Sequence, residues 1–307
     1  MTSRPLVSCI TIFYDAAPFL AEAIDSVLAQ RYEAWELLLV DDGSTDGSTA
    51  IARAAAEGAD GRIRYLEHEG HRNLGMSASR NLGVHHARGE LIALLDADDL
   101  WLPEKLARQV EILGHAPGAA MVFGATTERA IGVRAAETPE RRRTLGVAPD
   151  TLVHPPRLVP IWLRGLGETP GTCGVLVRRE AALAVAGFEE SFRALYEDQA
   201  FFYKLALRYP IFVSRGSWDI YRRHEASAVS VGEREGVYHP SRESESHRRF
   251  LEWLARYLRA SGLGDSDTAA ALRRALMPYE RPRTFRAMRW LSRRPWIPRR
   301  VRGWLGP

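Results

Sequence analysis

Three aspartates that follow one apolar run are the residues of this sequence best suited to do chemistry. The run LIALL at residues 91–95 follows Gly89, and the carboxylates of Asp96, Asp98 and Asp99 come directly after it. Adjacent carboxylates repel one another, and hard oxygen ligands of this kind hold divalent cations. The stretch therefore predicts a cation site. A solvated turn with helix-capping aspartates is the alternative when the stretch is considered alone.

A second apolar run also ends in acidic residues. Residues 35–40 read WELLLV, and they are followed by Asp41, Asp42 and the turn GSTDG at residues 43–47. Runs of this kind are typical of strands that are buried on both faces of a parallel sheet. Open α/β sheets place their ligands at the carboxyl ends of the strands. We therefore expect both acidic clusters at one edge of one sheet, which favours the cation site over an ordinary turn.

The elements that must position these acids alternate between strand and helix. Strands are predicted over residues 6–13, 35–40, 63–66 and 91–95. Helices are predicted over residues 18–30, from the turn at 43–47 to about 57, and over 76–87. This order implies parallel βαβ units with right-handed crossovers. The predicted fold class is α/β, with a Rossmann-like, mostly parallel sheet flanked by helices.

The second half of the chain carries weaker signals. Residues 126–150 are polar and rich in arginine, and we predict little regular structure there. Further strands are expected over residues 119–123, 171–177, 211–214 and 218–221, and further helices over 105–113, 180–186, 196–209, 247–259 and 268–277. We predict a main domain over residues 1–232, with halves at 1–125 and 126–232, and a helical extension over 233–307.

Composition limits the class of protein. A chain of 307 residues with 46% hydrophobic content can bury one large domain, or one domain with a small appendage. Cys9 and Cys173 give neither a zinc spacing nor a disulfide framework, which fits a reducing compartment. The sequence shows no run of transmembrane length and no signal peptide at its start. We therefore expect a cytoplasmic protein.

The basic charge is concentrated at the C-terminal end. Residues 281–307 contain nine arginines and no acid, so the other residues carry a net charge of −5. Phe285, Met288 and Leu291 fall on one side of a predicted helix, with most arginines on the other. A basic, tryptophan-bearing amphipathic helix suits an anionic membrane surface, which would place the protein peripherally on the inner face. The alternative is a helix that packs on the domain. We expect no nucleic-acid partner.

Five motifs occur in a fixed order along the chain. They are VSCITIFYD at residues 7–15, SVLAQRYEAWELLLVDDGSTD at 26–46, GMSASRNLG at 75–83, DADD at 96–99 and EDQ at 197–199. In this order they resemble the family 2 glycosyltransferases, inverting nucleotide-sugar enzymes of the GT-A fold, and the likeness extends to about residue 230. It implies a nucleotide-sugar-binding half over 1–125 and an acceptor and catalytic-base half over 126–232.

The resemblance implies a donor site at the acidic edge. Asp98 and Asp96 would hold Mg²⁺ or Mn²⁺, with Asp99 and His224 as further candidate ligands. The candidate contacts to the nucleotide sugar are Ile12, Phe13, Tyr14, Asp15, Asp42, Asn73, Arg80, Asp96 and Ala97. Asp42 would accept a hydrogen bond from the imide of uracil, and thymine or guanine would also supply such a donor, whereas cytidine and adenine would not. A UDP sugar is the first expectation, and Arg80 would steady the diphosphate.

Several of these residues also have ordinary structural explanations. For Arg80 the alternative is an arginine on a helix surface. His71 and Asn73 fit an exposed polar loop, and His224 fits a surface histidine. Ile12 and Asp15 stand where the family usually has proline and asparagine, which weakens the expectation for the base-binding edge.

Asp198 is the candidate catalytic base, and Glu197 lies beside it. Inversion requires a carboxylate that takes the proton of the acceptor hydroxyl on the face opposite the leaving group. The predicted position at a helix N-terminus favours the ionised form. A plain pair of helix-capping acids is the alternative.

The predicted function is transfer of a sugar from a nucleotide-diphosphate sugar to a hydroxyl of a glycan or lipid-linked acceptor, in cell-surface polysaccharide or glycoconjugate biosynthesis. The QxxRW signature of processive synthases is missing, which predicts single additions. A sugar-nucleotide pyrophosphorylase would need a glycine-rich loop where FYD stands at residues 13–15. An inactive nucleotide-sugar or glycan-binding protein would not need both Asp98 and Asp198.

Overall fold

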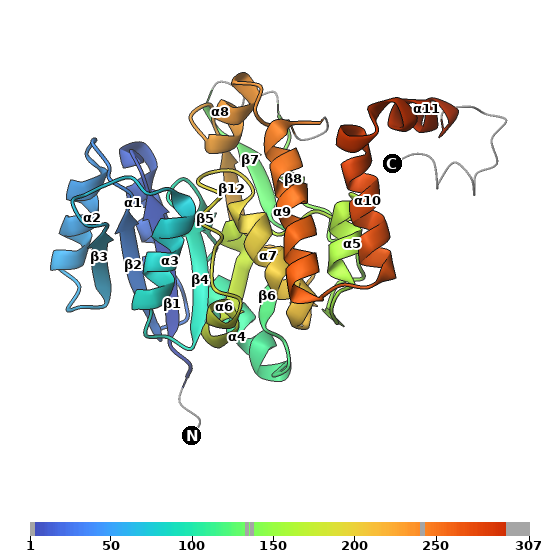
Figure 1. Cartoon of the computed structure of the whole chain (residues 1–307). Coiled ribbons are helices and arrows are strands. Elements are labelled where there is room, and N and C mark those ends of the chain that lie inside the picture. The colour runs from blue at the N-terminus through green and yellow to red at the C-terminus, as the bar shows by residue number, and fades with distance from the viewer. Residues whose placement is uncertain (1–3, 133–134, 136–137, 240–242, 293–307) are drawn as a thin grey trace.

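The computed structural model describes residues 4–132, 135, 138–239 and 243–292 (Figure 1). The strands are β1 (Val7–Phe13), β2 (Trp35–Asp41), β3 (Ile63–Glu67), β4 (Leu91–Asp96), β5 (Leu100–Trp101), β6 (Met121–Phe123), β7 (Thr127–Ala130), β8 (Arg141–Arg142), β9 (Thr151–Val153), β10 (Val175–Arg178), β11 (Ile211–Val213) and β12 (Asp219–Arg223). The helices are α1 (Ala17–Leu28), α2 (Ser48–Glu57), α3 (Met76–His86), α4 (Lys105–His115), α5 (Leu158–Leu163), α6 (Arg179–Ala184), α7 (Glu197–Arg208), α8 (Ala228–Arg234), α9 (Glu245–Ser261), α10 (Ser266–Glu280) and α11 (Pro282–Ser292).

The four strands predicted in the first half lie side by side in one parallel arrangement. The large sheet has the order β3-β2-β1-β4-β10-β6-β11-β9, and β1 pairs in parallel with both β2 and β4. The predicted βαβ units are confirmed. Strands β1 and β2 are buried along their whole length. Strands buried on both faces of a sheet need mostly apolar residues, which is why they coincide with the apolar runs of the sequence. Strand β10 is antiparallel to β4 and begins the second half of the sheet.

The two faces of the sheet build two apolar cores. Leu37 and Leu39 of β2 pack with residues of α1, α2 and α4 on one face. Leu38 and Val40 point the other way and pack with residues of α3, α5, α6 and α7, because successive strand residues alternate between faces. Helices α3, α7 and α9 belong to this second face (Figure 1).

The segment predicted to have little regular structure contributes to a second sheet. Residues 127–130 and 141–142 form β7 and β8, and the sheet has the order β5-β12-β7-β8. The prediction for residues 126–150 was therefore wrong in part. Short polar strands show no alternation of apolar residues, and here they are held by ion pairs instead: Arg141 and Arg143 both contact Glu128. Helices α5 and α8 were also not predicted.

The predicted C-terminal helices pack on the body of the molecule. Phe250 and Leu254 of α9 and Leu272 of α10 belong to the same core as α7. Helix α11 confirms the predicted helix at the start of the basic segment, whereas residues 293–307 lie outside the described part of the chain. Among the described residues, no helix has the length and apolar character needed to cross a membrane.

Candidate active site

The acidic residues of β2 and β4 lie at one edge of the sheet, as predicted. Strand β1 lies between these two strands, with Phe13 paired to Asp41 and Ile12 paired to Asp96. The carboxyl ends of all three strands therefore meet. Since this is the edge at which parallel sheets bind ligands, we take it as the candidate donor site.

Asp42 is buried beneath a loop. Its Oδ1 atom accepts a hydrogen bond from the backbone N–H of Leu74 (2.8 Å), and Oδ2 accepts one from Gly75 (3.0 Å). A Cβ atom at Gly43 would lie 2.8 Å from the backbone of Asn73, so only glycine permits this close approach. A carboxylate offers about four acceptor positions, so these backbone donors do not fill Asp42. Its side chain is 6% exposed, and His68 Nε2 lies 3.6 Å from Oδ1.

The residues at the end of β1 that were predicted to contact the nucleotide sugar differ in their exposure to solvent. Ile12 and Phe13 are buried, whereas the Tyr14 side chain is 53% exposed and can meet a planar base. Asp15 has a φ of 47°, and its Oδ1 atom accepts a hydrogen bond from the backbone N–H of Thr45 at 2.6 Å. The carboxylate of Asp15 thus orders the turn beside Asp42.

The loop before α3 is tied to the same turn. The His71 Nε2 atom lies 2.8 Å from the carbonyl oxygen of Ser44, and Nδ1 lies 2.8 Å from Glu67. The Ser44 carbonyl and then the Glu67 carboxylate raise the pKa of His71. The amide oxygen of Asn73 faces the guanidinium of Arg193 at 3.3 Å. His71 is therefore engaged with this turn, and Asn73 remains exposed beside it.

The three aspartates after β4 point in different directions. Asp96 and Asp98 stay partly open, and Ala97 between them is buried. Asp99 is fully buried, and its Oδ1 atom accepts a hydrogen bond from the backbone N–H of Arg222 at 2.9 Å. Burial, followed by the charges of Asp98 and Asp96, raises the pKa of Asp99 well above its usual range. The turn into β5 thus directs the Asp99 side chain inward, and its assignment as a further metal ligand stays a prediction.

Arg80 is buried, so it is not an arginine on the surface of its helix. Its side chain is 1% exposed, and its two terminal nitrogens contact Asp96 and Glu197, each at 2.6 Å. The guanidinium is buried between two carboxylates and links the end of β4 to the start of α7. Its predicted contact with a diphosphate stays a prediction.

The candidate base belongs to the same charged cluster. Burial and the neighbouring Asp198 carboxylate raise the pKa of Glu197 to about 8, and Arg80 opposes this shift. Burial also raises the pKa of Asp198, again against the effect of Arg80. Three carboxylates around one guanidinium raise the proton affinity of the cluster. A raised pKa suits Asp198 to take a proton from an acceptor hydroxyl.

His224 is brought to the acidic edge, as the metal prediction requires. Its Nε2 atom lies 2.9 Å from the Asp98 Oδ2 atom, and its ring packs on Phe19 with centroids 4.5 Å apart. The neighbouring Arg222 was missed as a site residue. It is 6% exposed and donates to the carbonyl oxygen of Asp98 and to Glu22 of α1. The run of basic residues RRH directly after a predicted strand was the signal that could have identified it.

The carboxylates and His224 form no complete metal centre by themselves. Among the described residues, no group of three or more His, Cys, Asp or Glu side chains is arranged to hold a metal ion. Asp98 and His224 form a pair, and Asp96 is held by Arg80.

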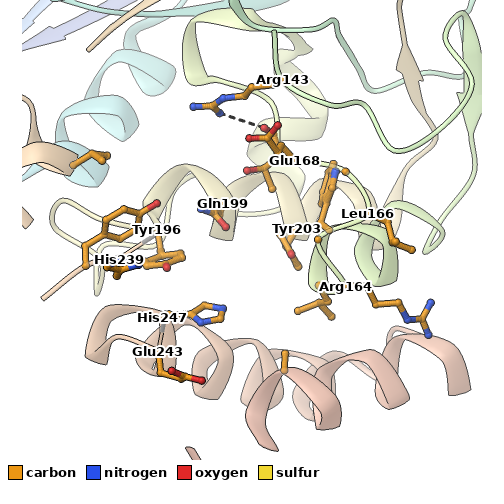
Figure 2. A pocket seen from close by; sticks show the side chains of 18 of the residues that line it. Arg143, Arg164, Leu166, Glu168, Tyr196, Gln199, Tyr203, His239, Glu243 and His247 are labelled. Carbon is orange, nitrogen blue, oxygen red and sulfur yellow. Dashed lines mark hydrogen bonds between the residues drawn. The ribbon is translucent and has the colours of Figure 1, made fainter. Parts of the chain in front are cut away.

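A large cavity lies beyond the N-terminus of α7. It has a volume of about 760 Å³, and Tyr196, Gln199 and Tyr203 contribute to its wall. Figure 2 shows Gln199 and Tyr203 on α7, with Glu243 on the opposite side of the cavity, and Tyr196 just before α7, close to His239 and His247. The cavity adjoins the candidate base and does not include the carboxylates at the sheet edge.

The sequence matches one family of known proteins. The model of the family described as Glycosyl transferase family 2 matches residues 8–174, just over half of the chain. EpsE of Bacillus subtilis (strain 168), which carries a glycosyltransferase name, is 42% identical over 113 residues, or 37% of this chain and 40% of EpsE. TuaG of the same organism, named for teichuronic acid biosynthesis, is 40% identical over 112 residues, or 36% of this chain and 42% of TuaG. The aligned residues span about two fifths of these relatives.

Solved structures resemble the chain over most of its length. TarS of S. aureus, crystallised with UDP-GlcNAc, has a TM-score of 0.66 and 18% identity, and the match covers 91% of this chain and 75% of TarS. The mannosyltransferase PcManGT from Pyrobaculum calidifontis, in complex with GDP-Man and Mn²⁺, has a TM-score of 0.52 and 22% identity, with 94% and 84% covered. At these identities the likeness concerns the fold. From the family match and this shared architecture, the chain belongs to the family 2 glycosyltransferases and has the GT-A fold.

Proposed function

We propose that the protein transfers one sugar from a nucleotide-diphosphate sugar to an acceptor hydroxyl, with inversion at the anomeric carbon. The observation that carries this proposal is the buried bridge Asp96–Arg80–Glu197. It ties the carboxylates on the leaving-group side to the helix that presents Asp198. An inverting enzyme needs these two groups on opposite sides of the sugar, at a constant separation.

The candidate metal ligands at the sheet edge fit a divalent cation. Asp98 and Asp96 offer hard carboxylate oxygens, with His224 beside them, and Mg²⁺ or Mn²⁺ commonly combines one or two carboxylates with phosphate oxygens of a substrate. When bound, such an ion would neutralise charge that develops on the departing diphosphate. The chain's own groups hold the rest: Arg80 orients Asp96, and Arg222 and His224 orient Asp98.

We propose a uridine nucleotide as the donor. Asp42 has an acceptor position left, and a carboxylate there selects bases with a ring N–H donor, which uracil, thymine and guanine have and cytosine and adenine lack. TarS was crystallised with UDP-GlcNAc. The name of TuaG, which refers to teichuronic acid biosynthesis, further supports a role in polysaccharide biosynthesis, for which we propose a glycan or lipid-linked acceptor.

The donor proposal predicts selective stabilisation by nucleotides. UDP with Mn²⁺ should raise the melting temperature, because a ligand at about 100 times its Kd stabilises a protein by about 2.7 kcal/mol. CDP and ADP should stabilise less, and EDTA should remove most of the UDP effect. Thermal denaturation across UDP sugars would then rank the donors. Equal stabilisation by UDP and CDP would contradict the role of Asp42, and full stabilisation in EDTA would contradict the metal.

We further propose that helix α11, with Arg281 directly before it, binds an anionic membrane surface. Arg281, Arg283 and Arg286 are exposed, while Phe285 and Met288 are half-buried. Changing the three arginines to glutamate should weaken binding to phosphatidylglycerol vesicles by a factor on the order of 100 or more, at about 1 kcal/mol per basic residue. Co-sedimentation measures this.

A matched control changes three exposed arginines elsewhere, Arg31, Arg108 and Arg129, to glutamate. This variant has the same net charge and should bind nearly as well as the wild type. If the two variants lose binding equally, only overall charge matters, and α11 returns to a packing role.

A further inference from the structure

The cavity of about 760 Å³ is built largely from residues that lie outside the family match. That match ends at residue 174, whereas Tyr196, Gln199, Tyr238 and His247 in the cavity wall all follow it. The volume falls within the range of about 300–1,000 Å³ that is typical of small-molecule sites. The cavity is therefore a feature of this chain's second half and C-terminal helices.

The charged groups of the wall largely neutralise one another. The lining contains five arginines and four glutamates. Arg141 contacts Glu128 and Glu168, each at 2.8 Å, and Arg143 contacts Glu128 at 2.9 Å. Because the formal charges of these arginines and glutamates nearly balance, the wall gives little net attraction for a polyanion. The cavity is thus suited to a ligand without net charge.

Aromatic side chains form a large part of the remaining wall. Trp162, Tyr196, Tyr203, Tyr221, Tyr238 and Tyr279 all line the cavity. Sugar rings have apolar C–H faces edged by hydroxyls, which suits them to flat aromatic rings that carry a polar atom at the edge. Paired carboxylates and guanidinium groups can exchange hydrogen bonds with the hydroxyls. This combination favours a neutral saccharide over an acyl chain.

Tyr196 joins the cavity to the candidate base. It is the residue before α7 and has a φ of 68°, a conformation that is uncommon for tyrosine and occurs where surrounding packing enforces it. The packing comes from α9: the Tyr196 ring stacks on Phe250 with centroids 5.1 Å apart and on His247 at 5.8 Å. Asp198 lies two residues further along. A ligand that contacts the Tyr196 ring therefore lies beside the base.

We propose that this cavity binds a neutral oligosaccharide of about two to three sugars, with one end at Tyr196 and Gln199. The assignment of this saccharide as the acceptor rests on the proposed transferase function, since its terminal hydroxyl would then face Asp198. Helices α9 and α10 and the residue Phe285 of α11 close the far side, so the C-terminal helices determine which saccharide fits.

The test uses three neutral trisaccharides as probes: cellotriose, maltotriose and chitotriose. Their binding to the full chain is measured by saturation-transfer NMR. At least one should bind the wild type. Ala275→Trp, which places a large ring in the cavity from α10, should weaken that binding at least tenfold. Ala270→Trp is the matched control, because Ala270 is exposed on the same helix and is no part of the cavity wall. Leu166→Trp tests the same point from a loop residue that is 60% exposed, so folding should be unaffected.

The outcomes separate the two hypotheses. No binding of any neutral trisaccharide, unchanged binding in both cavity variants, or binding of trigalacturonic acid alone would each overturn the cavity assignment. UDP with Mn²⁺ should stabilise all variants equally, because Asp42, Asp96 and Asp98, the proposed contacts to the nucleotide and the metal, lie outside the cavity. A chain that binds a trisaccharide at this cavity but no nucleotide would contradict the transferase proposal and leave the cavity assignment standing.

Discussion

Replacing Asp198 with asparagine is expected to reduce sugar transfer by a factor of about 10² to 10⁴, the usual contribution of a general base. Asparagine keeps the size of the side chain and still accepts a hydrogen bond, but it cannot take the acceptor proton. UDP affinity should stay unchanged, because Asp198 lies on α7 and the nucleotide carboxylates lie at the ends of β2 and β4. Product formation by mass spectrometry and UDP binding by calorimetry measure the two effects separately.

Asp25→Asn is the matched control for this variant. Asp25 is exposed on α1, so its replacement makes the same chemical change without touching the site. It should leave both transfer and UDP binding near wild-type values. Turnover retained in the Asp198→Asn variant would remove Asp198 from the role of base. Loss of UDP affinity together with transfer would instead indicate that Asp198 supports the donor site.

Replacing Arg80 with methionine is expected to have the second large effect, on stability and transfer together. The change leaves Asp96 and Glu197 without their buried cation. Removing one partner of a buried ion pair costs about 3–5 kcal/mol, because an uncompensated charge remains. Transfer should fall as well, since the bridge between the ends of β4 and α7 is lost. Urea denaturation gives the free energy of unfolding, and the transfer assay gives the rate.

Arg64→Met separates stability from function. Arg64 of β3 contacts the buried Glu36 at 2.9 Å. Glu36 lies near the start of β2, whereas Asp41 lies at the other end of that strand. This variant should lose stability but retain transfer at temperatures where it is folded. Arg80→Lys should also be impaired, because one ammonium group cannot reproduce a guanidinium that contacts two carboxylates.

A double variant tests whether Arg80 acts through Glu197. Adding Glu197→Gln to Arg80→Met removes one of the unpaired carboxylates and should recover part of the lost stability. It should not restore transfer, because Asp96 and α7 remain unconnected. Full activity in the single variant Arg80→Met would show that the bridge is dispensable and would remove the main support for the proposed function.

The family match and the structure support different halves of the site. The match covers residues 8–174, which include the acidic residues at the ends of β2 and β4. Asp198, His224 and most of the cavity wall lie beyond it. Their assignment rests on the way in which α7, β12 and the C-terminal helices pack against the first half.

Local patterns in the sequence were sufficient for the first half of the fold. An apolar run such as residues 91–95 must be buried wherever it lies, and the acids after it must stay near the end of that strand. The parallel order of the first four strands and the gathering of Asp42, Asp96 and Asp98 at one edge were predictable for this reason. Short polar strands such as β7 and β8 lack such a pattern, and residues 126–150 were predicted poorly.

Tertiary packing alone decided which charges face one another. The ion pair between Arg80 and Glu197 joins residues that are 117 positions apart, and no local pattern marks it. The same holds for the inward turn of Asp99 and for the stacking of Tyr196 on α9. A buried charge requires a partner, and the partner is supplied by whichever element packs against it. The sequence by itself therefore determined the acids and the strands that carry them, whereas the structure determined how Arg80, Tyr196 and the cavity connect those acids to the candidate base.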